Sequence, residues 1–285
     1  MARADLDAMT IRVMDRENLE EAINWAAAEG WNPGIDDAER FLRADPGAFL
    51  ATERDGEIAG TVSCALYGER YAFIGLYIVR PELRGSGIGT ELFERALDRA
   101  AGRAVGLDGV PAQQGSYERH GFDLAHRNVR WRARAVAAER PAGLAELASV
   151  PFDELIAYDA GVFGAERSHF LGAWIGRPPG QALACVANGE LAGYGVVREC
   201  GAGVKVGPLF ADDPEIAELL LTGLVAATGP ARDVFLDVPA ANGPATELAE
   251  AWGTEPVFET ARMYRNGRPP EDTARVFGVT TFEFG

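Results

Sequence analysis

RPELRGSGIGTELFERAL, residues 80–97, is the stretch that decides the fold. Gly85, Gly87 and Gly89 alternate with other residues, so the backbone there can approach a ligand closely. An amphipathic helical pattern follows at once, and its apolar face is formed by Leu92, Phe93, Ala96 and Leu97. A glycine loop that opens a helix directs several backbone N–H groups and the helix dipole to one point, which binds anions. The stretch therefore predicts a phosphate-binding loop.

Two common phosphate-binding loops do not match this stretch. A dinucleotide-binding loop needs G-x-G-x-x-G after the first strand of a βαβ unit. Here Thr90 stands where the third glycine belongs, and the loop follows an antiparallel hairpin with a turn at Asp55-Gly56. A nucleotide P-loop needs a lysine after its last glycine, and this stretch has none. A glycine-rich turn without a ligand is the remaining alternative.

The residues around the loop predict an α+β fold on a mixed, mainly antiparallel sheet flanked by helices. Before the loop, hydrophobic periodicity predicts helices over residues 18–29 and 36–43 and strands over residues 49–52, 58–66 and 72–79. After the loop helix, it predicts a strand over residues 104–107, a helix over residues 113–120 and a strand over residues 129–134. In this last strand, Arg130, Arg132 and Arg134 alternate with apolar residues. We expect a strand with one solvated face, and a phosphate contact by the three arginines is the alternative.

Length and charge restrict the class of protein. The chain has 285 residues, of which 47% are hydrophobic, and this is enough for two domains of ordinary size. No run reaches the ~18 consecutive apolar residues of a membrane helix, and the first residues lack the pattern of a secretory signal. We therefore expect a soluble, cytoplasmic protein. The net charge of −16 disfavours nucleic acid and anionic membranes as partners, so an anionic ligand needs local donors.

The cysteines and histidines do not form the pattern of a metal site or of a disulfide framework. The chain has three of each, which are Cys64, Cys185, Cys200, His120, His126 and His169. The cysteines are odd in number and far apart, and the histidines lack the spacing of metal ligands. The sequence therefore predicts no metal site and no disulfide.

Short segments recur in the second half of the chain at nearly one offset. GEIAG at residues 56–60 recurs as GELAG at residues 189–193, which is 133 residues later. IGLYIV begins at Ile74 and VGPLFA begins at Val206, which is 132 residues later. A third match, RHGF against AWGT, also has an offset of 132. Three matches in the same order indicate a duplicated domain.

The glycine loop and a second motif together resemble a known family. Residues 84–89, RGSGIG, resemble the R/Q-x-x-G-x-G/A signature of the GCN5-related N-acetyltransferases, and V-x-P-E precedes them as it usually does in that family. SYERHGF, residues 116–122, resembles the Y-x-x-x-G-F segment of the same family. The resemblance covers about residues 10–135. GWNPG, FIGLYIV and GLDGV are similar to a bacterial and archaeal subgroup that carries an extra C-terminal domain of similar ancestry.

The resemblance implies acetyl-CoA as the acyl donor. The pyrophosphate of the donor is then expected on the glycine loop and the start of the helix, formed by Arg84, Gly85, Ser86, Gly87, Ile88, Gly89 and Thr90. The pantetheine arm is expected to pair with the backbone of Ile78 and Val79 like an added strand. Arg84 either adds a charge-assisted contact to phosphate or braces the loop at the surface.

The resemblance also implies which residues take part in the chemistry. By its position in the motif, Tyr117 donates a proton to the departing thiolate, and the alternative is a packed tyrosine whose hydroxyl lies in water. A backbone N–H near Val79 is the natural donor to the oxyanion. Asp108 either accepts a proton as general base or forms a turn with Gly109. Many family members have asparagine where Val110 stands, which leaves the base unassigned.

The loop between the first two helices is expected to lie opposite the thioester. Trp31 and Asn32 in this loop either recognise a polar small molecule or fix the loop in place. Together these features predict transfer of an acetyl group to a primary amine of a small molecule, by direct attack in a ternary complex. The alternative is a non-catalytic acyl-CoA or metabolite sensor. Tyr117 beside an intact loop favours the enzyme, because a sensor needs no proton donor.

The second unit is expected to be a degenerate copy of the first. The expected parts are an N-terminal catalytic domain over residues 1–136, a linker over residues 137–148 and the degenerate domain over residues 149–285. At an offset of 132, Ala217, Leu219 and Leu221 fall on the three loop glycines, and Ala249 falls on Tyr117. The copy is therefore expected to shape the acceptor pocket, cover it or form a dimer contact. A homodimer is among the expected assemblies.

Overall fold

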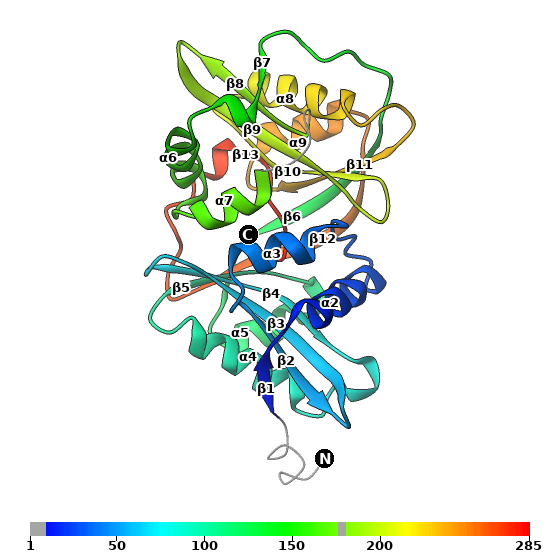
Figure 1. The fold of residues 1–285 in the computed structure, drawn as a ribbon, viewed down its shortest axis with the longest axis vertical. Coiled ribbons are helices and arrows are strands. Elements are labelled where there is room, and N and C mark those ends of the chain that lie inside the picture. The colour runs from blue at the N-terminus through cyan, green and yellow to red at the C-terminus, as the bar shows by residue number, and fades with distance from the viewer. Residues whose placement is uncertain (1–9, 176–180) are drawn as a thin grey trace.

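The first half of the chain alternates helices and strands around the glycine loop (Figure 1). In the computed structural model, which describes residues 10–175 and 181–285, its elements are β1 (Ile11–Val13), α2 (Arg16–Ala28), α3 (Asp37–Ala44), β2 (Phe49–Arg54), β3 (Glu57–Tyr67), β4 (Tyr71–Val79), α4 (Ile88–Arg99), β5 (Ala104–Gly109), α5 (Gln114–Arg119) and β6 (Asp123–Arg134). Asp15 begins α2 by accepting a hydrogen bond of 2.9 Å from the backbone of Asn18. The expected helices and strands are confirmed to within a few residues, except that β6 begins earlier, at Asp123.

The second half repeats this order of elements. It contains β7 (Leu144–Glu146), α6 (Phe152–Phe163), α7 (Ser168–Ile175), β8 (Ala182–Ala187), β9 (Glu190–Glu199), β10 (Val204–Ala211), α8 (Pro214–Ala226), β11 (Asp233–Pro239), α9 (Gly243–Ala251), β12 (Glu255–Arg265) and β13 (Val276–Gly278). Short 3₁₀ helices lie at Pro81–Leu83, Pro111–Gln113, Leu147–Ser149 and Thr273–Arg275. The strands β2 to β6 correspond in order to β8 to β12. None of the helices formed by residues 10–175 and 181–285 has the length and apolarity of a membrane span.

The two halves share one sheet. The strands of the described residues lie in the order β1-β2-β3-β4-β5-β12-β6-β11-β10-β9-β8-β7, and β13 lies beside β10. β12 is inserted between β5 and β6 and is antiparallel to both, while β6 is antiparallel to β11. Each half therefore gives its last long strand to the other half, and Figure 1 shows β6 and β12 at the centre of the molecule. Strand pairing thus crosses the expected domain boundary, and residues 144–146 of the expected linker form β7.

Two buried ion pairs join the exchanged strands. Arg130 on β6 faces Asp237 on β11, with N–O distances of 2.6 and 2.8 Å. Arg262 on β12 faces Asp108 on β5, with N–O distances of 2.9 and 2.6 Å. The four side chains are at most 3% exposed. The same bidentate pair therefore occurs once in each copy of the duplicated fold.

These ion pairs correct two expectations from the sequence. The expected solvated face of β6 is wrong at Arg130, because β6 lies inside the sheet and β11 brings a carboxylate to that face. Arg132 and Arg134, farther along the same face, are exposed. The expected turn at Asp108 and Gly109 is also wrong, because β12 pairs along this segment and extends β5 to its end.

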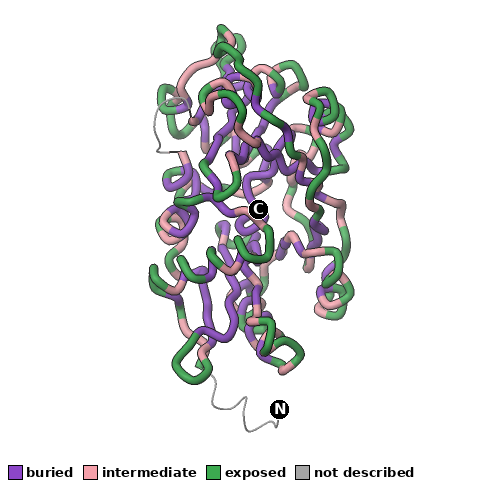
Figure 2. Tube along the Cα trace, turned by 90° about the vertical axis from the view of Figure 1, so that its right-hand side faces the viewer, coloured by how far each residue is buried: buried purple, intermediate pink, exposed green. Residues whose placement is uncertain are grey.

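An aromatic cluster joins the halves where the C-terminal segment enters the first half. Phe284 stacks on Phe41 of α3 and on Phe170 of α7, with ring centroids 4.5 and 5.9 Å away. Trp174 closes the cluster, because it stacks on Phe41 at 6.0 Å and on Phe170 at 4.8 Å. The hydroxyl of Tyr67 donates a hydrogen bond of 2.6 Å to the carbonyl of Phe284. Figure 2 shows the segment ending at residue 285 among buried parts of both halves.

Candidate active site

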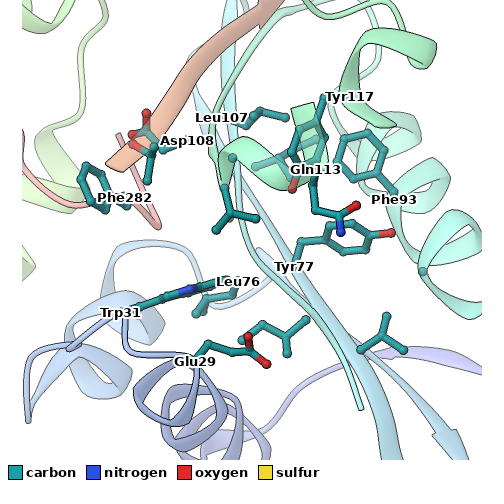
Figure 3. Close-up of a pocket in the computed structure, with 18 of the residues that line it drawn as sticks. Glu29, Trp31, Leu76, Tyr77, Phe93, Leu107, Asp108, Gln113, Tyr117 and Phe282 are labelled. Atoms are coloured by element: carbon teal, nitrogen blue, oxygen red, sulfur yellow. The ribbon is translucent and has the colours of Figure 1, made fainter. Parts of the chain in front are cut away.

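A cavity opens where two neighbouring strands separate. β4 and β5 pair in parallel from Tyr71 to Ile74, and their pairing ends there. Beyond this point β4 forms a bulge, in which Leu76 has a φ of 45° and Thr61 Oγ1 donates a hydrogen bond of 2.8 Å to the carbonyl of Leu76. A cavity of about 480 Å³ lies beyond the end of the pairing. Figure 3 shows the side chains that surround it.

One end of the cavity is formed by the glycine loop and the start of α4. Gly85 and Gly87 have φ angles of 74° and 98°, in the left-handed region that favours glycine. Within residues 10–175 and 181–285, no side chain caps α4 at Gly87. The first amides of α4 therefore lack a partner inside the helix, and Gly89 and Thr90 lie on the cavity wall. This end of the cavity is suited to an anion.

Of the other residues predicted to hold the donor, some line the cavity and some do not. Those that line it are Ile78, Val79 and Arg84. Arg84 braces the loop, because its Nη2 donates a hydrogen bond of 2.5 Å to Glu29 Oε1 and its Nε donates one to a strand carbonyl. Ser86 and Ile88 do not line the cavity, since Ser86 Oγ donates to a loop carbonyl and Ile88 is fully buried in the core. These two residues can offer a ligand only their backbone.

Two tyrosines lie on the wall between the two ends of the cavity. Tyr117 on α5 packs against Gly109, where a Cβ atom would lie 2.2 Å from the ring, and it is 7% exposed. Burial raises the pKa of the Tyr117 phenol, and Tyr77 nearby raises it further. Sequence reasoning missed Tyr77, whose hydroxyl oxygen would be 2.4 Å from a Cβ atom at Gly89. Burial also raises the pKa of Tyr77.

The opposite end of the cavity combines residues of both halves. Its lining includes Trp31, Phe258, Thr260, Phe282 and Glu283, while Glu29, which also lines the cavity, lies against Arg84 of the glycine loop. Figure 3 shows Trp31 and Phe282 across the cavity from Tyr117 and Phe93. Both halves hold Trp31 in place, because Arg130 Nη1 on β6 and Lys205 Nζ on β10 donate to its carbonyl at 2.5 and 3.4 Å. No motif marks the residues of the second half, so sequence reasoning missed them.

Two predicted residues have structural partners instead. Asn32 is not on the cavity wall, because its side chain exchanges two hydrogen bonds of 2.9 Å with the backbone of Ala202 and so joins the halves. Asp108 lines the cavity, but its carboxylate accepts hydrogen bonds from Arg262 and, at 2.8 Å, from Asn128. A carboxylate engaged in this way is a poor candidate for the general base.

Comparison with known families assigns both halves. A model described as "Acetyltransferase (GNAT) family" matches residues 13–122, which include the glycine loop and Tyr117. A model described as "Acetyltransferase (GNAT) domain" matches residues 155–278. The chain belongs to the GNAT acetyltransferases. It is an acyltransferase that contains two GNAT domains in tandem.

Individual relatives extend over most of the chain. Holothin acyltransferase from Pseudoalteromonas sp. (strain SANK 73390) is 28% identical over 92% of this chain and 89% of its own. The crystal structure of a candidate acetyltransferase from Pyrococcus horikoshii is similar with a TM-score of 0.82 and 26% identity, over 97% of this chain and 96% of its own. A tandem GNAT protein from the clavulanic acid biosynthesis pathway shares the fold, with a TM-score of 0.60 and 18% identity over 90% of this chain and 98% of its own.

In the second GNAT domain, the positions that correspond to the cavity of the first domain are occupied by segments of the chain itself. β13 pairs with β10 at Leu209 and Phe210, which correspond to Tyr77 and Ile78 at the offset of 132 residues. A strand of the chain therefore covers the edge that is open in the first domain. The carboxylate of Asp213 caps α8 by accepting a hydrogen bond of 2.8 Å from its backbone, so an internal anion already occupies that helix start. These contacts favour the first domain as the site of the acyl donor.

Proposed function

We propose that the chain transfers the acetyl group of acetyl-CoA to a primary amine of a small molecule, by direct attack in a ternary complex. The observation that carries the proposal is the cavity itself, in which a glycine-lined helix start, a buried tyrosine and an apolar wall face one another. The acyltransferase class of the chain supports the reaction type. The second domain supports the proposal by adding residues to the side of the cavity opposite the helix start.

The backbone supplies most of the attraction for the donor in this proposal. The net charge of −16 repels an anion at long range, so the amides of residues 85–90 and the dipole of α4 hold the pyrophosphate, while Arg84 braces the loop. Ile78 and Val79 pair with β3 on one edge, and their other edge lies beyond the pairing with β5. The pantetheine arm pairs with that edge as an added strand does.

The transfer step needs one attack and three proton movements. The amine nitrogen attacks the thioester carbonyl carbon, a C–N bond forms, and the C–S bond breaks. A backbone N–H near Val79 donates to the oxyanion, and Tyr117 gives its proton to the departing sulfur. The proton lost by the amine passes to solvent, and the phenolate takes one back. The raised pKa of Tyr117 keeps the phenol protonated at neutral pH and ready to donate.

Calorimetry and thiol release test the proposal together. We expect heat of binding when CoA or acetyl-CoA is added to the full chain, and release of free thiol from acetyl-CoA with at least one amine of a broad panel. Absence of heat with both ligands would contradict the assignment of the donor. Binding of acetyl-CoA without thiol release by any amine would instead support a non-catalytic acyl-CoA-binding protein.

A substitution in the glycine loop tests whether the loop binds the pyrophosphate of the donor. We expect Gly85→Ala to weaken CoA binding about 10-fold, because the methyl group narrows the approach of phosphate to the amides. The matched control is Gly102→Ala. Gly85 and Gly102 have φ angles of 74° and 81°, and both positions have no atom within 4 Å of an added Cβ, so backbone strain is similar. Equal CoA dissociation constants for the two variants would contradict the proposal that the glycine loop binds the pyrophosphate.

A further inference from the structure

Two residues that line the cavity each have a buried polar side-chain atom without a hydrogen-bond partner among the described residues. Within residues 10–175 and 181–285, Thr260 Oγ1 and Glu283 Oε1 are both without a partner. Both residues line the cavity, and both are 2% exposed. The other carboxylate oxygen of Glu283 accepts a hydrogen bond from Thr281. Buried polar groups are nearly always hydrogen-bonded, so two such atoms on residues that line one cavity indicate a ligand that donates hydrogen bonds.

Glu283 lies near the place where the proposed function puts the acyl group. Its backbone packs on Gly75, where a Cβ atom would lie 2.2 Å from the carbonyl oxygen of Glu283. Gly75 directly follows Ile74, the last residue of β4 that pairs with β5. The bulge at Leu76 comes next, before the edge proposed for the donor. The backbone of Glu283 is therefore placed at the fork of the two strands, beside the proposed path of the thioester, and the residue also lines the cavity.

The cations near Glu283 are engaged with other groups. Arg130 binds Asp237 and the carbonyl of Trp31, and Lys205 donates to the same carbonyl. Among the ion pairs of the described residues, none includes Glu283. These two cations and Arg198 interact with Glu283 through space, but no side chain in the part of the chain that the structure describes donates to its Oε1, so this oxygen is available to a hydrogen-bond donor of a ligand.

The walls beside these two oxygens are aromatic. Phe258 and Phe282 pack against each other with ring centroids 6.2 Å apart, and Arg130 stacks on both rings. Trp31 lines the cavity near Phe282, as Figure 3 shows. Rings of this kind take up flat apolar groups, and their faces also attract an ammonium group.

We propose that Glu283 and Thr260 bind the nitrogen of the acceptor, and that the acceptor is a primary amine carried on a flat, apolar body. An ammonium group has three donors, and a carboxylate and a hydroxyl oxygen accept two of them. The bound ammonium loses one proton to solvent before its nitrogen attacks the thioester. The proposal rests on the proposed acyl transfer. It also gives the second domain a role, because both acceptor-binding residues come from that domain although it does not bind the donor.

Binding of simple arylalkylamines tests this inference on the full chain. The probes are 2-phenylethylamine and tryptamine, with putrescine as a flexible, non-aromatic comparison, each titrated in the presence of saturating CoA. We expect the arylalkylamines to bind more tightly than putrescine. Glu283→Gln should weaken their binding about 30-fold, as expected for loss of a hydrogen bond to a charged group, while the dissociation constant for CoA stays within about 2-fold. Thr260→Val should weaken binding of the arylalkylamines about 5-fold.

Thr280→Val is the matched control. Thr280 Oγ1 is also buried and without a partner in the described part of the chain, but Thr280 does not line the cavity. We expect its amine binding to match that of the unmodified protein. The inference would be overturned if the Glu283→Gln variant bound the arylalkylamines as tightly as the unmodified protein does. It would also be overturned if Thr280→Val weakened their binding as much as Thr260→Val does, or if putrescine bound more tightly than the arylalkylamines. Absence of thiol release with bound amine would count against the proposed reaction alone.

Discussion

Replacement of Asp237 by alanine is expected to lower the free energy of unfolding by about 3–5 kcal/mol. The change leaves Arg130, 2% exposed, as a buried charge without its carboxylate. Burial alone would raise the pKa of Asp237, but Arg130, together with Lys205 and Arg198, outweighs burial and lowers the pKa, so the carboxylate is charged in the folded chain. Urea unfolding followed by tryptophan fluorescence measures the loss, since the chain has five tryptophans.

A second ion pair on the same strand provides the control. Arg132 on β6 pairs with Glu255 on β12, and their side chains are 44% and 60% exposed. Glu255→Ala is expected to cost less than about 1 kcal/mol, because solvent screens the pair. The double replacement Arg130→Met with Asp237→Leu should recover most of the stability, because it leaves no unpaired charge. Similar losses for the buried and exposed pairs would contradict the importance of the buried pair.

The glycine loop could be predicted from sequence because its signals are local. Alternating glycines, an apolar helical face and the preceding apolar strand all lie within about 25 residues, and each acts through short-range geometry. The same holds for the helix and strand positions and for the repeated segments. Tyr117 could be placed because it stands at a fixed distance from Gly121 in a motif. The structure places Tyr117 and the loop on one cavity.

The exchange of strands could not be predicted, because it is decided by contacts between distant segments. The alternation of arginine and apolar residues in β6 is the same for a solvated face and for a face that meets a carboxylate. Arg130 is buried and Arg132 is exposed because β11 brings a carboxylate to Arg130, and the sequence of β6 does not show where β11 lies. In the same way, Asp108-Gly109 is typical of a turn until β12 pairs beside it. Glu283 and Thr260 carry no motif, so only folding of the second domain against the first brings them to the cavity.

Tyr117→Phe is expected to lower turnover at least ~10²-fold with the affinity for acetyl-CoA preserved. The phenyl ring keeps its packing on Gly109 and Phe93, so the fold and the donor site are retained. The lost group is the hydroxyl that protonates the departing sulfur. Thiol release under saturating acetyl-CoA measures turnover, and calorimetry with CoA measures affinity.

Tyr77→Phe is the matched control, because Tyr77 is a second phenol on the wall of the same cavity. Its hydroxyl lies against Gly89 at the start of α4, so its loss should affect CoA binding more than turnover. We expect a change in turnover of less than about 3-fold, the small effect of a group that takes no part in proton transfer. A large loss for Tyr77→Phe together with normal turnover for Tyr117→Phe would reverse the assignment of the proton donor. Losses of equal size would mean that the two phenols act as one hydrogen-bonded unit, consistent with the influence of Tyr77 on the pKa of Tyr117.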